Sequence, residues 1–220
     1  MAVITSSATC MILPTSLKAL CLVLIMTCGA CGQDMLAGTG MSPRILEYAR
    51  GHPQTLQVLT NAFVTCFGGQ RLRVFYYYRD GENCLRGAHR CESDSSVEIL
   101  VQADQPVLDE YLVLLFEACN VPYESRYDGL INRAASRDIS RDDYIAEMSR
   151  LEHLAALKVK TLIAGVDFGK REEANSHYYE GFRKCPAGFK DFAEHWKKVS
   201  ESDDPQKLYG VLYSRIQPYH

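Results

Sequence analysis

Residues 108–120 read LDEYLVLLFEACN, and this stretch decides the fold. Asp104 and Pro106 precede it as helix-start signals, and Pro122 follows it as a stop signal. The only charges along it are three acidic side chains, at Asp109, Glu110 and Glu117. A helix that is apolar around most of its circumference is buried. We therefore expect a central helix, with the rest of the chain packed around it.

Amphipathic segments on both sides of this helix predict an α-rich domain. Ser42 before Pro43 is typical of a helix start, and Ser140 with Asp143 resembles a capping box. Glycine and proline punctuate the segments where helices end. The other predicted helices span residues 43–50, 54–67, 123–136, 141–164, 171–184 and 187–199, with a last turn or helix from 205.

Two segments have the composition of β-strands. Residues 71–80 read RLRVFYYYRD and residues 96–103 read SVEILVQA, both rich in aromatic or β-branched side chains. Asp80-Gly81 is a turn signal between them. The predicted fold class is α+β and α-rich, with one two-stranded antiparallel hairpin packed against about six helices.

Residues 1–33 have the composition of an export signal. They contain no acidic residue, one lysine (Lys18), an apolar run over 19–26, and then small residues up to Cys31. A basic, an apolar and a small-residue region in that order define a secretory signal peptide. Met11 begins a shorter version of the same pattern, so either Met1 or Met11 is a possible start of translation.

Gly29-Ala30-Cys31 resembles the lipobox of bacterial lipoproteins, in which the cysteine after the cleavage point is acylated. The resemblance implies lipidation at Cys31 and a protein held on the membrane of the cell envelope, facing the periplasm. Cleavage after Ala30 without acylation, giving a secreted protein, stays open because Cys28 stands where a Leu-like residue is usual. An uncleaved membrane anchor from Met11 is a further alternative. The predicted organisation is a signal peptide over 1–30, a tether over 31–41 and one α-rich globular domain over 42–220.

The cysteines are consistent with export. Beyond residue 30 the thiols are Cys31, Cys66, Cys84, Cys91, Cys119 and Cys185. In an oxidising compartment such thiols form disulfides, and we predict a bridge between Cys84 and Cys91 that closes the long loop of the hairpin. Cys66 and Cys119 lie near the ends of two apolar helices and are a second candidate pair. The alternative for all of them is a free, buried cysteine.

The sequence contains no recognisable catalytic or metal-binding motif. There is no H-E-x-x-H, no G-x-S-x-G and no phosphate-binding loop. His177, Cys185 and His195 would form a site only if the last helices pack together, and Glu152 and His153 point in different directions on their helix. No catalytic residue, metal or cofactor is predicted, and the chemistry favours a protein that is not an enzyme.

Overall charge is nearly balanced, with 24 Lys and Arg against 27 Asp and Glu, which argues against nucleic-acid binding. Locally the balance is uneven, because every charged residue between Glu92 and Ser125 is acidic. One interpretation is internal pairing of Arg73 or Arg79 with Glu98 across the hairpin. The other is an acidic face for a cationic partner, with contacts from Tyr76, Tyr77, Tyr78, Glu98, Asp109 and Glu110.

These features predict an exported, membrane-tethered protein-binding module, such as a periplasmic inhibitor or immunity protein. Its partners would be another protein with a cationic surface and, through the N-terminal lipid, the membrane. One alternative is an exported hydrolase whose site is assembled from dispersed acidic residues and His177 or His195. Another is a structural envelope lipoprotein. A cleft with two or more titratable groups of shifted pKa would favour the hydrolase.

Overall fold

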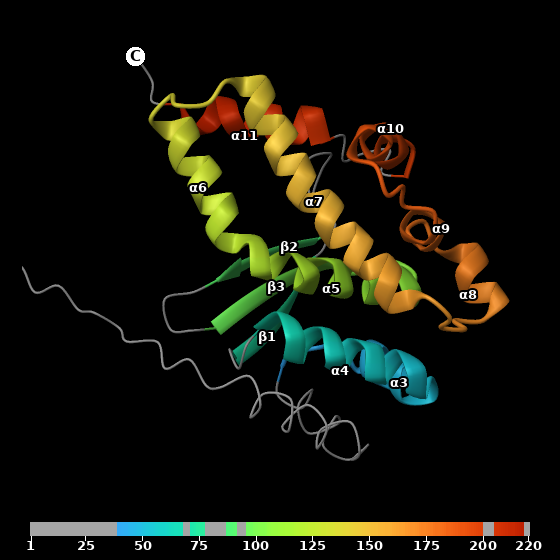
Figure 1. Ribbon diagram of the computed structural model, residues 1–220. Helices are drawn as coiled ribbons and strands as arrows, with labels where there is room; N and C mark the ends of the chain where they lie inside the picture. Colours follow the sequence, from blue (N-terminus) through green and yellow to red (C-terminus); the bar gives the residue numbers. More distant parts are fainter. Residues whose placement is uncertain (1–38, 68–70, 78–86, 92–95, 200–204, 218–220) are drawn as a thin grey trace, which may run out of the picture.

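The structure is a computed structural model that describes residues 39–67, 71–77, 87–91, 96–199 and 205–217 (Figure 1). The first part of the chain forms α3 (Pro43–Gly51), α4 (Pro53–Phe67), β1 (Arg71–Tyr77), β2 (Gly87–Cys91), β3 (Ser96–Gln102), α5 (Val107–Asn120) and the 3-10 turn η1 (Val121–Tyr123). The second part is helical: α6 (Glu124–Ala135), α7 (Arg141–Ile163), α8 (Lys170–Asn175), α9 (Tyr179–Arg183), α10 (Phe189–Val199) and α11 (Pro205–Ile216). The predicted α-rich α+β class is confirmed.

The sheet has three strands in the order β1-β3-β2. β1 runs parallel to β3, with Arg71 opposite Ser96, and β2 runs antiparallel to β3, with Cys91 opposite Val97. The predicted antiparallel hairpin of 71–80 with 96–103 is therefore wrong. The segment expected to be its loop contains β2, and because β2 forms the antiparallel pair with β3, β1 is left to join the other edge of β3 in the parallel direction.

α5 is the central helix that its apolar circumference predicts. Nearly all of its residues are buried, including the charged side chains of Asp109, Glu110 and Glu117. It packs against β2 and β3 on one side and against α7 and α4 on others. Directly after Asn120 the chain enters η1, where Pro122 stands.

α7 connects two hydrophobic clusters. Its first half, around Tyr144 and Met148, packs with α6 and α11 in the smaller cluster. Its second half, around Ala155 and Val159, belongs to the main core with α5. In Figure 1, α6 and α11 lie beside the first half of α7, and α5 lies between its second half and the sheet. Glu152 falls between the two halves, where the clusters meet.

The two predicted serine caps are present at the starts of α3 and α7. The Ser42 hydroxyl accepts from Ile45 N at the start of α3, and the Ser140 hydroxyl accepts from Asp143 N at the start of α7. Each bond satisfies one of the free N–H groups of a first turn. Within the described ranges, no helix is both long enough and apolar enough to cross a membrane.

Candidate functional site

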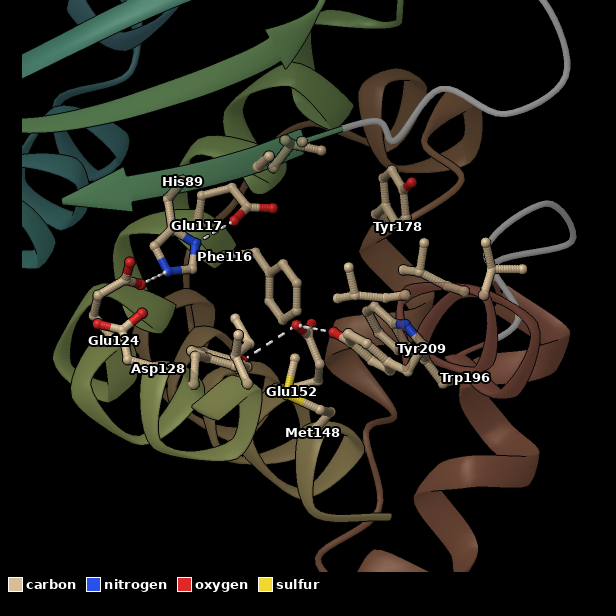
Figure 2. A pocket seen from close by; sticks show the side chains of 18 of the residues that line it. His89, Phe116, Glu117, Glu124, Asp128, Met148, Glu152, Tyr178, Trp196 and Tyr209 are labelled. Atoms are coloured by element: carbon tan, nitrogen blue, oxygen red, sulfur yellow. Dashed lines mark hydrogen bonds and ion pairs between the residues drawn. The ribbon is translucent and has the colours of Figure 1, made fainter. Parts of the chain in front are cut away.

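A cavity of about 480 Å³ lies where β2 and six helices meet (Figure 2). Its charged lining residues are four carboxylates and two cationic side chains. The carboxylates are Glu117, Glu124, Asp128 and Glu152, and the cations are His89 and Arg215. A concave site of this size with a few polar groups among apolar walls is typical of ligand binding.

His89, on β2, is held between two carboxylates. Its Nδ1 is 2.8 Å from Glu117 Oε2 and its Nε2 is 3.1 Å from Glu124 Oε2. Burial lowers the pKa of His89, but the hydrogen bonds and charges of the two glutamates outweigh burial and raise it to about 10. The same contact with His89 lowers the pKa of Glu124. At neutral pH the imidazolium between two carboxylates leaves this group with one net negative charge.

Glu152, on α7, is a second carboxyl group of the cavity that is hydrogen-bonded inside the fold. Its Oε1 accepts from the Tyr209 hydroxyl at 2.6 Å and from the Tyr127 hydroxyl at 3.2 Å. Burial raises the pKa of Glu152 to about 7, the charge of Glu117 adds to the rise, and the Tyr209 hydrogen bond opposes it. Because this pKa is close to neutral pH, small changes in the charges or hydrogen bonds around Glu152 are enough to add or remove its proton.

An aromatic cluster forms another wall of the cavity. The ring centroids of Phe116 and Trp196 are 5.7 Å apart, those of Phe182 and Trp196 are 5.3 Å apart, and Tyr178 is 6.1 Å from Phe182. Figure 2 shows Phe116 and Glu152 between the His89–Glu124 side of the cavity and the side with Trp196. Aromatic faces beside carboxylates are the chemistry that binds organic cations.

Residues 116–120 of α5 have the spacing of a zinc motif without its histidine ligands. In H-E-x-x-H, histidines at positions i and i+4 of a helix bind zinc and the glutamate between them is the base. Phe116, Glu117 and Asn120 stand at these positions. Glu152 lies close by, because the Tyr127 hydroxyl is 3.0 Å from Asn120 Oδ1 and 3.2 Å from Glu152 Oε1. A phenyl ring cannot bind zinc, and among the described side chains no group of three His, Cys, Asp or Glu is arranged to hold a metal ion.

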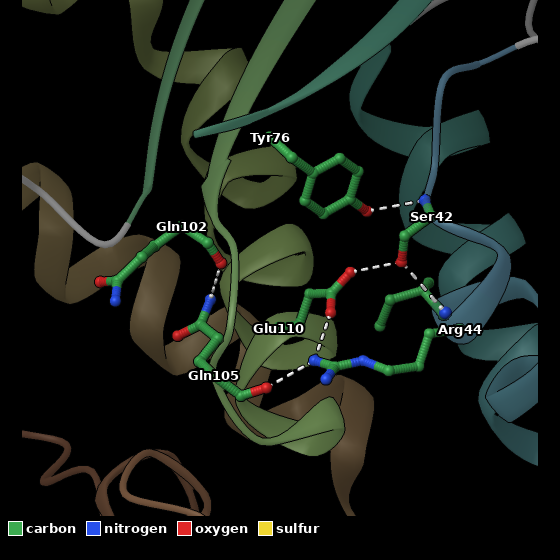
Figure 3. Close-up of polar contacts among 7 residues, drawn as sticks. Ser42, Arg44, Tyr76, Gln102, Gln105 and Glu110 are labelled. Carbon is green, nitrogen blue, oxygen red and sulfur yellow. Dashed lines mark hydrogen bonds and ion pairs between the residues drawn. The ribbon is translucent and has the colours of Figure 1, made fainter. Parts of the chain in front are cut away.

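Two of the carboxylates predicted to meet a partner are instead satisfied inside the fold, and Figure 3 shows the contacts of one of them, Glu110. Glu110 is 3% exposed, accepts from the Ser42 hydroxyl at 2.7 Å and pairs with Arg44 at 2.7 Å. Asp109 has no exposed surface and accepts from the Ser176 hydroxyl and from the backbone N–H of His177. A partner cannot reach either carboxylate without opening the fold.

The remaining predicted contacts lie in β1 and β3 or outside the described residues. Glu98 is buried and 3.4 Å from Arg73, which confirms the internal pairing interpretation for that arginine. The half-buried Tyr76 accepts from Ser42 N at 3.0 Å through its hydroxyl (Figure 3). Tyr77 is the last residue of β1. Tyr78 lies outside the described residues.

Of the residues predicted for the lipid and for the Cys84–Cys91 bridge, the structure describes Cys91 alone. Cys31 and Cys84 lie outside the described residues, so acylation of Cys31 and the Cys84–Cys91 bridge stay predictions. The cysteines that the structure describes, Cys66, Cys91, Cys119 and Cys185, are free thiols.

The three residues considered for a site near the C-terminus have separate surroundings. His195 Nε2 is 2.7 Å from Gly181 O, while the backbone N–H of His177 donates to Asp109. Cys185 is buried. None of the three lines the cavity.

The residues predicted as partner contacts include none of the charged residues that line the cavity, although the predicted acidic face extends over Glu117 and Glu124. One feature of the sequence indicated the cavity. Glu117 lies in an otherwise apolar stretch, and a buried carboxylate needs a compensating partner. His89 gave no such signal, because it lies in a segment expected to be a loop.

The comparisons with known proteins found no relative. The chain matches no protein-family model, no curated protein and no solved structure. The interpretation of the cavity rests on its own side chains.

Proposed function

We propose that the protein is an exported, non-enzymatic binding module whose cavity receives a positively charged group of a partner protein. The observation that carries this proposal is the cavity itself, in which carboxylates outnumber cations and aromatic rings form a wall. The proposal keeps the cationic partner expected from the acidic sequence, and it moves the contact from Glu98, Asp109 and Glu110 to the cavity. Export and a lipid at Cys31 rest on the sequence of residues 1–31.

Charge and shape both support a cationic ligand. His89 compensates one of the two carboxylates that it contacts, so Glu117 and Glu124 together keep a negative charge in a partly enclosed space. Glu152 adds a second negative charge when it ionises. A cation over a desolvated aromatic face gains about 2 kcal/mol in addition to the Coulomb attraction. A lysine or arginine side chain satisfies both features.

Two features of the site disfavour catalysis. His89 has a pKa of about 10 and is engaged at both ring nitrogens, so it cannot act as a general base near neutral pH. The H-E-x-x-H positions of α5 hold a phenyl ring and an amide, so the helix offers no histidine to a metal.

One observation favours the hydrolase alternative. Glu152 has a pKa of about 7 and lies near Glu117, and hydrolysis of glycosides uses a pair of carboxyl groups of which one has a raised pKa. A hydrolase would turn over nitrophenyl esters or glycosides, and Glu152→Gln would abolish that turnover. Such a result would replace the binding proposal.

The binding proposal has a direct optical test, because the single tryptophan of the chain, Trp196, lines the cavity. The full chain is titrated with benzyltrimethylammonium, and Trp196 fluorescence is followed. Neopentylbenzene, which has a quaternary carbon in place of the nitrogen, is the neutral control. We expect saturable binding of the cation that is at least about tenfold tighter than that of the control, since one lost ion pair with a buried group exceeds 1.4 kcal/mol.

Glu152→Gln is the matched variant, because it removes the charge and keeps the shape of the side chain. We expect it to weaken binding of the cation and leave binding of neopentylbenzene unchanged. Equal affinity for the two probes, or no saturable change with the cation, would refute the proposal.

A further inference from the structure

A cluster of two thiols and one ammonium group lies outside the cavity. Cys66 is the second-last residue of α4, Cys119 is the second-last residue of α5, and Lys158 is on α7. Lys158 Nζ donates to Cys66 Sγ at 3.0 Å, and the thiols of Cys66 and Cys119 are close enough for each to shift the pKa of the other. None of the three residues lines the cavity. Three elements that are distant in sequence therefore bring two thiols and a cation into contact.

The position of the two thiols would normally keep them protonated. Both lie in the last turn of a helix, where the negative end of the macrodipole opposes a thiolate, and both are buried. The interaction with the Cys119 thiol has the largest effect and lowers the pKa of the Cys66 thiol, and the Lys158 ammonium lowers it further. The pKa of the Cys119 thiol is raised by the same interaction and by burial.

Access to the two sulfur atoms is unequal. Cys66 is 8% exposed and follows the exposed Thr65, whose hydroxyl is 3.7 Å from Cys66 Sγ. Cys119 has no exposed surface. A small reagent therefore meets Cys66 first. This is the arrangement of an attacking thiol and a resolving thiol.

We propose that Cys66 and Cys119 form a reactive dithiol site, positioned by Lys158, that exchanges with small disulfides and closes to an intramolecular bond. The Cys66 thiolate attacks one sulfur of glutathione disulfide, the S–S bond of glutathione breaks, and one glutathione leaves and takes up a proton. Cys119 then loses its proton and attacks the Cys66 sulfur, which releases the second glutathione. Two cysteines are oxidised and one glutathione disulfide is reduced to two thiols, so the electrons balance.

Cys185 is the internal control that the structure provides. It is buried, burial raises the pKa of its thiol to about 11, and Lys160 donates to its backbone carbonyl rather than to its sulfur. It therefore has burial without an activating cation at the sulfur, and it should react slowly as long as the fold is intact.

The first test treats the reduced full chain with glutathione disulfide at neutral pH and locates the products by peptide mass spectrometry. We expect a Cys66–Cys119 disulfide in the wild type, and a stable Cys66–glutathione adduct in Cys119→Ser. We expect neither product in Cys66→Ser. The proposal fails if Cys119→Ser gives no adduct at Cys66, or if the wild type retains glutathione there without closing the bridge.

The second test separates Lys158 from a purely structural role. The rate of Cys66 alkylation by iodoacetamide is measured across pH in Lys158→Met and Lys158→Arg. We expect the midpoint of the rate profile to move to higher pH in Lys158→Met and to return in Lys158→Arg. At a pH below the wild-type midpoint, the rate in Lys158→Met should fall about tenfold for each pKa unit that the thiol rises. Slow alkylation of Cys185 verifies that each variant is folded. A folded Lys158→Met protein that alkylates at the wild-type rate would show that Lys158 does not activate Cys66.

Discussion

The two ends of α5 each bury a glutamate, and they treat it differently. Near the start of the helix, Glu110 receives the Ser42 hydroxyl and the Arg44 guanidinium, and Arg44 also donates to the Gln105 carbonyl (Figure 3). Near its end, Glu117 shares His89 with Glu124 and faces a cavity that also contains Glu152 (Figure 2).

The difference shows what turns a buried carboxylate into a candidate site. At the Glu110 end, each carboxylate oxygen has its own donor, and the contacts tie α3 to α5. At the Glu117 end, one imidazolium serves two carboxylates, and open space adjoins them. Burial requires a partner in both places. Only the second place has negative charge left over for a ligand.

The largest effect is expected when zinc ligands are introduced at the Glu117 end of α5. In the double variant Phe116→His and Asn120→His, the two introduced imidazoles stand one turn apart and face Glu152, which supplies a third ligand. We expect equimolar Zn²⁺ to be retained through gel filtration, measured by atomic emission. Each single variant is the control and should retain none. A folded double variant without zinc would contradict the convergence of Phe116, Asn120 and Glu152.

The second prediction compares removal of the cation at each end. His89→Gln leaves Glu117 and Glu124 uncompensated, and breaking such a buried pair destabilises the fold by about 3–5 kcal/mol. In Arg44→Gln the loss should be about 1 kcal/mol, because the Arg44 side chain is 49% exposed and water screens the pair. Urea unfolding at pH 7 measures both values. Equal losses would remove the distinction between the two ends.

The third prediction concerns pH and separates His89 from Glu152. Because the folded pKa of His89 is raised from 6.5 to about 10, its stabilisation is complete below pH 6.5 and is lost as the pH rises towards 10. The folded pKa of Glu152 is raised from 4.5 to about 7, so this group lowers the free energy of unfolding as the pH rises from 4.5 to 7. The free energy of unfolding, measured against pH, should lose its upper slope in His89→Gln and its lower slope in Glu152→Gln. A wild-type slope that persists in both variants would contradict these assignments.

The same contrast explains how far sequence reasoning could go. The central position of α5 follows from its apolar circumference, and the starts of α3 and α7 follow from Ser42 and Ser140. These are local properties, because the periodicity and the capping residues lie within one element. The separate directions of Glu152 and His153 are local too, and the structure confirms them, since His153 lies 2.8 Å from Pro186 O.

The sequence could not decide which charges are paired inside the fold. It offered Arg73 as one partner of Glu98 and none for Glu110, and only the packing of β1 and α3 shows that Arg73 and Arg44 neutralise them. His89 belongs to a short strand with no β-branched residue, GAHRC, so its composition does not distinguish it from a loop. The parallel pairing of β1 with β3, which the hairpin prediction missed, is a consequence of that strand.

The smallest expected effect compares one tyrosine hydroxyl at each end of α5. Tyr209→Phe removes a hydrogen bond that favours ionised Glu152, so the pKa of Glu152 should rise further above 7. Tyr76→Phe removes a bond from the Ser42 N–H and has no contact with the cavity. Each change should lower stability by about 1 kcal/mol, the net contribution of one hydrogen bond.

The two tyrosine variants differ in what they do to Glu152, and carboxyl ¹³C NMR titration reads this directly. We expect the Glu152 midpoint to move to higher pH in Tyr209→Phe and to stay at its wild-type value in Tyr76→Phe. If the cavity binds a cation through ionised Glu152, the midpoint for binding benzyltrimethylammonium moves by the same amount in Tyr209→Phe, because the probe and the proton compete for one carboxylate. An NMR midpoint that moves while the binding midpoint does not would place the cation away from Glu152, at the shared carboxylates of His89.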